Sequence, residues 1–197
     1  ILSPFFVNPF FKDDTFRFDL SETFRSTDGK RRTFVHEIWR EHDEKFGAPL
    51  VALSETMVAR GREMMAHLLP PGRKFVALHV RESGFYGDTN RVTRNADITT
   101  YEPAIRYLID RGYTVVRMGD PSMVAIDDMI SRCGPNFIDY ARSDLRSDFL
   151  DAYLCSQCDF FIGLTSGLLG LPTVFERPCC NVNCYNVTNC LGFFQPD

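Results

Sequence analysis

From about residue 54 onward, short apolar runs alternate with segments whose apolar residues recur at helical spacing. The apolar runs predict strands at about 75–80, 113–118, 136–140 and 159–164, with a candidate last strand at 173–175. The intervening segments predict helices at about 54–69, between Thr99 and Gly112, at 122–132 and at 146–157. Alternating strands and helices indicate an α/β fold with a parallel sheet, and strands that are apolar throughout suit a sheet covered on both faces.

Residues that favour helix ends support these boundaries. Ser54 suits the N-cap of the first helix, and Pro70-Pro71-Gly72 ends it. The segment Thr99-Thr100-Tyr101-Glu102 resembles a capping box. Gly112 suits the C′ position of the helix that follows.

Composition excludes several classes of function. The 197 residues suit one large domain, or one domain and a fragment of another. The net charge of −4 argues against nucleic-acid binding by bulk electrostatics. The sequence contains no apolar run near the ~18 residues that a membrane span needs. The first residues, ILSPFFVNPFF, make a poor signal peptide, and both ends look cut, as in a piece of a longer protein.

Seven cysteines permit a zinc site, a set of disulfides or simple burial as reduced thiols. Cys155 and Cys158 form a C-x-x-C, but they fall in a helical segment and not in a zinc-binding turn. The remaining cysteines lack paired spacing. We therefore expect no metal and no cofactor, and an odd number of cysteines favours a reducing, cytoplasmic compartment.

Polar residues gather where the predicted strands end. They are His79 and Arg81 after the first strand, Arg117 and Asp120 after the second, Asp139 and Tyr140 after the third, and Thr165, Ser166 and Gly167 after the fourth. In open α/β sheets, ligands bind outside the carboxyl ends of the strands. The arrangement therefore predicts one binding cleft at that edge.

The residue types in this predicted cleft suit a phosphorylated ligand. An arginine offers a planar fork that matches phosphate oxygens, and a Ser-Gly step at a helix N-terminus offers backbone N–H groups. Neither G-x-G-x-x-G nor G-x-x-x-x-G-K-[ST] occurs, which argues against a classical dinucleotide enzyme and a P-loop protein.

Three segments of the chain resemble motifs of the fucosyltransferase superfamily, which includes α1,6-fucosyltransferases and protein O-fucosyltransferases. HVR at 79–81 resembles its H-x-R motif, LDAYLCSQCDFFIGLTSG at 150–167 its late motif, and GDP at 119–121 the segment between them. The closer likeness, over about 45–183, is to bacterial glycosyltransferases that share HVRE, RNADI, VVRMGDPSM and DYA. The resemblance implies a GT-B enzyme. Residues 71–197 would form its Rossmann-like nucleotide-sugar domain, and 1–70 an interdomain or acceptor-side segment.

The same resemblance implies roles for individual residues. Arg81 would contact the diphosphate of the donor and His79 its nucleoside. Asp151 would meet the base, with Asp120 and Ser166 nearby. The chain departs from the fucosyltransferase pattern at Glu82-Ser83-Gly84 and at Gly167, so neither guanine nor fucose specificity follows.

The resemblance implies a glycosyltransferase that works with inversion. The sequence has no D-x-D at a strand end, which favours catalysis without a metal, with arginines neutralising the leaving diphosphate. Arg81 is the expected charge stabiliser, supported by Ser166 and Gly167, and Arg117 either assists it or pairs with Asp120. Asp88 and Glu82 are candidates for the general base.

The sequence leaves open the identity of the acceptor and two alternatives to a glycosyltransferase. The acceptor is a glycan, a lipid-linked group or a protein. A nucleotide-sugar-binding module without catalysis is the alternative, because it would need the same His79, Arg81 and Ser166. An epimerase or phosphatase is a further alternative, although the strand ends lack the cysteine or paired carboxylates for such chemistry.

Overall fold

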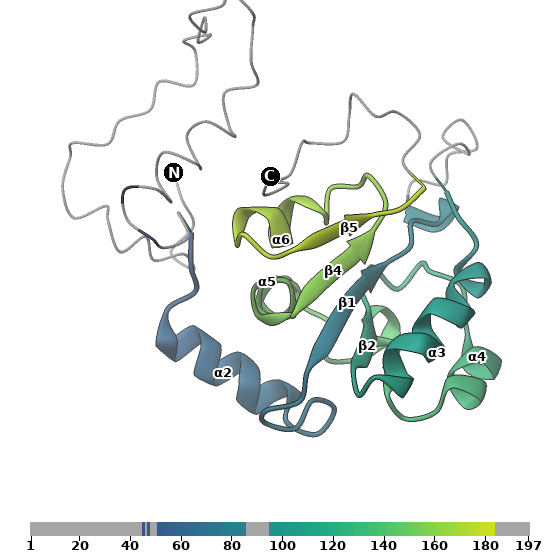
Figure 1. Cartoon of the computed structure of the whole chain (residues 1–197), viewed down its shortest axis with the longest axis horizontal. Coiled ribbons are helices and arrows are strands. Elements are labelled where there is room, and N and C mark those ends of the chain that lie inside the picture. The colour runs from purple at the N-terminus through teal and green to yellow at the C-terminus, as the bar shows by residue number, and fades with distance from the viewer. Residues whose placement is uncertain (1–44, 46, 48–50, 86–94, 184–197) are drawn as a thin grey trace, which may run out of the picture.

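The structure, a computed structural model, describes residues 45, 47, 51–85 and 95–183. Within these residues, five parallel strands form one sheet in the order β3-β2-β1-β4-β5 (Figure 1). The strands are β1 (Phe75–His79), β2 (Thr114–Arg117), β3 (Phe137–Ile138), β4 (Phe160–Gly163) and β5 (Cys179–Asn181). The predicted parallel sheet is confirmed, and its strand order is consistent with a Rossmann-like fold.

Helices cover both faces of the sheet, as Figure 1 shows. On one face lie α2 (Glu55–Met65), α5 (Asp148–Gln157) and α6 (Gly170–Val174); on the other lie α3 (Glu102–Asp110) and α4 (Asp127–Cys133). Residues of β1 alternate between the two layers: Ala77 packs with the first set and Leu78 with the second. This alternation explains why the strand is apolar throughout.

Side chains and glycine set the ends of several helices. Ser54 Oγ accepts a hydrogen bond from Met57 N at 3.3 Å, which is the predicted N-cap of α2. Gly112 has φ 84° just after α3, as expected for its C′ position. Thr99 is not the cap of α3, because it lies inside a 3-10 turn, Ile98–Tyr101, that Asp97 caps.

Two elements differ from those predicted: the strand at 173–175 and the start of the helix expected from Ser122. Residues 173–175, expected as a strand, lie at the end of α6, where Phe175 N donates to Leu171 O at 3.2 Å. The last strand in the described residues is β5, which pairs with β4 through Phe161 and Cys179. The helix expected from Ser122 begins only at Asp127, because Asp120 Oδ1 accepts from Ser122 N and holds a turn there.

Part of the segment 1–70 belongs to the same core as the sheet. Met65 and Leu69 are buried in the layer that contains α5. Gly61 lets α2 approach α5 closely, since a Cβ there would lie 2.2 Å from Cδ2 of Tyr153. The role predicted for residues 1–44 lies outside the described residues.

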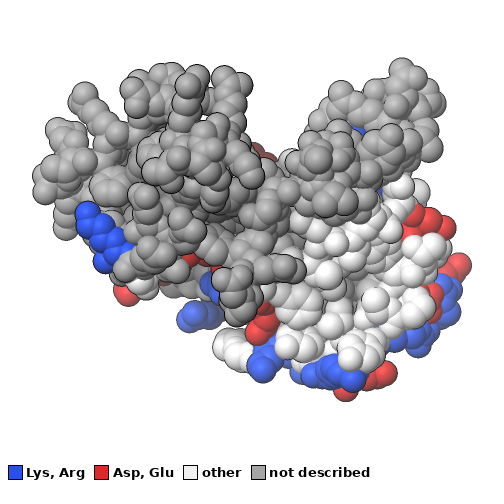
Figure 2. All heavy atoms as spheres, turned by 45° about the horizontal axis from the view of Figure 1, so that its top comes forward, with Lys and Arg blue, Asp and Glu red and all other residues white. Residues whose placement is uncertain are grey.

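In the described part of the chain, no helix combines the length and apolarity that a membrane crossing requires. On the described surface that faces the viewer in Figure 2, basic and acidic side chains are interspersed along the margin. This mixed pattern agrees with the charge argument made from composition.

Candidate functional site

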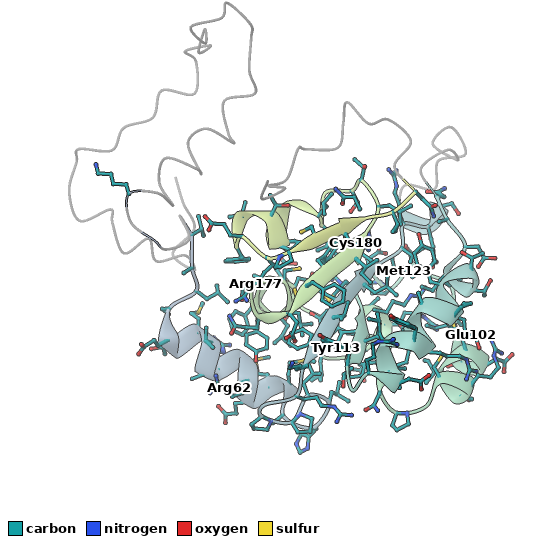
Figure 3. The ribbon with its side chains drawn as sticks, in the orientation of Figure 1. Arg62, Glu102, Tyr113, Met123, Arg177 and Cys180 are labelled. Atoms are coloured by element: carbon teal, nitrogen blue, oxygen red, sulfur yellow. The ribbon has the colours of Figure 1, made fainter. Side chains whose placement is uncertain are left out.

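A cavity of about 400 Å³ opens at the carboxyl edge of the sheet. It lies where the strand order reverses between β1 and β4, the position at which open α/β sheets bind ligands. Figure 3 labels one lining residue, Met123, near the carboxyl ends of β1 and β2. The predicted residues that line the cavity are His79, Arg81, Glu82, Asp120, Asp151, Thr165, Ser166 and Gly167.

His79 is the last residue of β1 and is 8% exposed. Its Nδ1 lies 3.1 Å from Met118 O. A carbonyl only accepts, so Nδ1 carries the proton and Nε2 is an acceptor. Burial lowers the pKa of His79, against a smaller opposing effect of the Met118 hydrogen bond. The ring is therefore neutral at physiological pH.

Glu82 lines the cavity, but both of its carboxylate oxygens are engaged. Oε1 accepts from Arg117 Nη2 at 2.7 Å, and Oε2 accepts from Val124 N at 2.7 Å. These two hydrogen bonds tie the loop after β1 to Arg117 and to the backbone of Val124. They favour a structural role for Glu82 over its predicted role as general base, which stays a prediction. Asp88, the other candidate base, lies outside the described residues.

Arg117 does not line the cavity and is completely buried. Besides Glu82, it contacts Asp139 Oδ2 at 3.2 Å and Val124 O at 2.9 Å. Burial raises the pKa of Asp139, and Arg117 offsets part of that effect. Arg117 thus lies outside the cavity to which donor binding was assigned, and its carboxylate partners are Glu82 and Asp139 and not the predicted Asp120.

Asp120 forms the cavity wall after β2. Its Oδ1 accepts from Ser122 N at 2.9 Å and closes the turn. The preceding Gly119 has φ 149°, and a Cβ there would lie 2.3 Å from Met123 Sδ. This tight turn places Gly119 and Asp120 at the wall of the cavity.

Asp151 lies in the first turn of α5 and is 8% exposed. Its Oδ2 lies 3.5 Å from Nη2 of Arg146, whose Nε donates to Gly119 O at 2.9 Å. Arg146 was missed by sequence reasoning, which placed it inside a helix. The residue that could have revealed it is Ser147, a favourable N-cap residue. Ser147 Oγ caps α5, so Arg146 lies in the preceding loop, where it lines the cavity.

Two buried oxygens of the cavity residues, Asp151 Oδ1 and Ser166 Oγ, have no hydrogen-bond partner among the described residues. The expected helix N-terminus at Ser166-Gly167 is wrong, because α6 begins only at Gly170 and residues 165–169 form turns. Gly167 faces open space, with no heavy atom within 4 Å of the place a Cβ would take. Unpaired buried polar atoms are unfavourable unless a ligand or water meets them.

The described cysteines show how the C-x-x-C is used. Cys155 and Cys158 are fully buried in the core around α5, and burial raises the pKa of Cys158 to about 12. Within the described residues, no three or more His, Cys, Asp or Glu side chains are grouped so that they could hold a metal ion. Cys184 and Cys190 lie outside the described residues.

No protein-family model matches this chain. A search of curated proteins finds no significant match either. The function is therefore inferred from the fold and from the chemistry of the cavity.

Proposed function

We propose that this protein is a glycosyltransferase that moves a sugar from a nucleoside diphosphate sugar to an acceptor hydroxyl, with inversion and without a metal. The observation that carries the proposal is the cavity at the reversal point of the sheet, where Asp151 Oδ1 and Ser166 Oγ are buried without partners beside arginines. Buried oxygens in this state favour a ligand that carries hydrogen-bond donors and acceptors of its own.

The size and polar groups of the cavity suit such a donor. A volume of about 400 Å³ falls within the usual range for small-molecule sites. The neutral His79 offers Nε2 as an acceptor for a ribose hydroxyl. Asp151 Oδ1 would accept from the base. Ser166 Oγ, with the open space at Gly167, would donate to a phosphate oxygen.

Arg81 would then act on the leaving group. Negative charge grows on the diphosphate as the bond to the sugar breaks, so a positioned guanidinium binds the transition state more tightly than the ground state. One such preorganised donor contributes about 3 kcal/mol. Because Glu82 is engaged, the general base would be Asp88 or a residue from the acceptor side.

The likeness of the H-x-R and late motifs to the fucosyltransferase superfamily supports a GT-B arrangement with the donor held by the described domain. The acceptor would be a glycan, a lipid-linked group or a protein. We place the reaction in the cytoplasm. The five described cysteines are unpaired, as a reducing compartment favours.

Turnover of donor sugars tests the proposal. The full chain would be incubated with UDP-, GDP- and ADP-sugars and a mixture of acceptors, and release of nucleoside diphosphate would be measured. We expect release from one class of donor and its loss in Arg81→Ala, but not in Arg73→Ala, which changes an arginine outside the cavity. Nucleotide binding without release, in the presence of acceptors, would favour the non-catalytic binding module. Neither binding nor release would contradict both.

A further inference from the structure

Arg146 connects two walls of the cavity. From the loop before α5, its Nε reaches the carbonyl of Gly119 after β2, and its Nη2 reaches Oδ2 of Asp151 on α5. Its side chain is 29% exposed, so the guanidinium lies at the cavity and not in the core. The fork of an arginine can hold both partners at once, whereas a lysine ammonium has no such fixed geometry.

The backbone around Arg146 is fixed by its neighbour Ser147. Ser147 Oγ accepts from Leu150 N at 3.3 Å, and Ser147 N donates to the hydroxyl of Tyr140 at 3.1 Å. Asp151 N in turn donates to Ser147 O at 2.8 Å. Arg146 and Asp151 are therefore held in a defined mutual position before any ligand enters.

Because of this contact, the two carboxylate oxygens of Asp151 have different surroundings. Oδ2 is the oxygen near Arg146, and Oδ1 is the buried oxygen without a partner. We propose that Arg146 is a positioning residue that holds Oδ2 of Asp151 and so leaves Oδ1 available as an acceptor for the ligand of the cavity. That this ligand is a nucleotide rests on the proposed function; the positioning of Asp151 does not.

The charges around Asp151 make the role of Arg146 measurable. Burial raises the pKa of Asp151. The nearby Tyr140 hydroxyl, whose proton is donated to Ser147 O at 3.2 Å, and Arg146 offset this in part, while Asp148 adds to the rise. Without Arg146 the pKa should rise further, and the carboxyl would stay protonated to higher pH. The other ionisable groups near Asp151, on α5 and around the cavity, are Cys155, His79, Arg81, Glu82 and Asp120.

The first test measures Asp151 without any ligand. The carboxyl carbons of the full chain would be followed by ¹³C NMR from about pH 3 to 9, with Asp151 assigned through Asp151→Asn. Arg146→Gln should raise the Asp151 midpoint by about one pH unit. Arg146→Lys should restore part of the shift. Arg142→Gln, which changes an exposed arginine in the same loop, should leave the midpoint unchanged.

An unchanged midpoint in Arg146→Gln would overturn the proposal. Circular dichroism and thermal melts would establish that each variant is folded. If Arg146→Gln does not fold, Arg146→Lys decides alone. An Asp151 midpoint above the wild-type value then supports the proposal, and a midpoint equal to the wild-type value overturns it.

The second test measures how Arg146 affects nucleotide binding. ADP, CDP, GDP and UDP would be titrated into the wild type and the variants. For a nucleotide that binds, Arg146→Gln should weaken affinity about tenfold at pH 7 and more at pH 5.5, where Asp151 is increasingly protonated. In an Asp151→Asn background the same change should cost less than about twofold, because the two residues act through one contact.

Additive losses in this double-mutant cycle would overturn the proposal. If none of the four nucleotides binds the wild type, the proposed function fails. The ¹³C titration then decides the positioning of Asp151 by itself.

Discussion

Two arginines, each paired with carboxylates, are used in opposite ways. Arg117 is completely buried, and its guanidinium contacts Glu82, Asp139 and the carbonyl of Val124. Arg146 is 29% exposed at the cavity, and its partner Asp151 keeps one buried oxygen without a partner. Both centres carry largely buried acidic groups, and Glu82 of the first also lines the cavity, but only in the second does the arginine itself line it.

The comparison shows that an arginine at the end of a strand is not by itself evidence for a ligand. The Arg117 centre joins the loop after β1 to the loops after β2 and β3, so its energy contributes to folding. Each centre has one buried polar atom without a partner among the described residues, Arg117 Nε in the first and Asp151 Oδ1 in the second, but only Asp151 belongs to a residue that lines the cavity. We therefore expect the first to govern stability and the cavity residues to govern binding.

The largest effect should come from breaking the Arg117 centre. Arg117→Met leaves the carboxylates of Glu82 and Asp139 buried without their cation, and should lower the free energy of unfolding by about 3–5 kcal/mol. Urea denaturation at pH 7 measures it. Lys74→Met, at an exposed site away from this centre, should change it by less than about 0.5 kcal/mol. A loss below about 1 kcal/mol for Arg117→Met would mean that this centre does not hold the loops together.

Arg81 should show the reverse behaviour. Because it would face charge that grows in the transition state, Arg81→Ala should lower kcat by about two to three orders of magnitude, more than it weakens donor binding. Arg81→Lys should recover only part, since a point charge does not reproduce the fork. His79→Ala should act mainly on donor affinity. If Arg81→Ala instead lowers Tm while the folded enzyme keeps near-normal turnover, Arg81 only braces its loop.

The sequence predicted the strands and the edge at which polar residues gather, because continuous apolar runs and helix caps are local signals. It could not separate Arg117 from Arg146. The carboxylates that engage Arg117 lie 35 and 22 residues away along the chain, and no local pattern shows them. Arg146 was overlooked because capping by Ser147 shifts the start of α5 by two residues.

The last strand was missed for a related reason. Residues 179–181 read Cys-Cys-Asn, which has none of the β-branched or aromatic residues typical of strands. They form β5 because they pair with β4, which is a tertiary interaction.

Substitution of Ser166 should affect nucleotide binding without lowering the stability of the free protein. Its hydroxyl is buried without a partner, so Ser166→Ala should leave the free protein equally or slightly more stable. The same change should weaken nucleotide binding about tenfold, the value of one hydrogen bond. Ser54→Ala, which removes the N-cap of α2, should instead lower stability by about 1 kcal/mol without affecting binding. Equal binding by wild type and Ser166→Ala would exclude Ser166 from the site.

The smallest effect concerns Asp151 and pH. Because its folded pKa is raised, wild-type stability should decline as pH rises from about 4 through that pKa. Asp151→Asn lacks this decline, so it should be the more stable protein at pH 7, and the two should converge below about pH 4. Thermal melts from pH 3 to 8 measure the difference. A variant that is less stable than wild type at pH 7 would show that the Arg146 contact outweighs the burial of Asp151.

Calorimetric titration of the protein with ADP, CDP, GDP and UDP at pH 7 shows whether the cavity is a nucleotide site. We expect at least one nucleotide to bind, and Arg81→Ala and Asp151→Asn each to weaken its binding about tenfold or more. Arg73→Ala, which removes contacts to Thr114 and Asn136 outside the cavity, should leave affinity unchanged. No binding at millimolar nucleotide, or binding that survives both cavity substitutions, would contradict a donor site at this edge of the sheet.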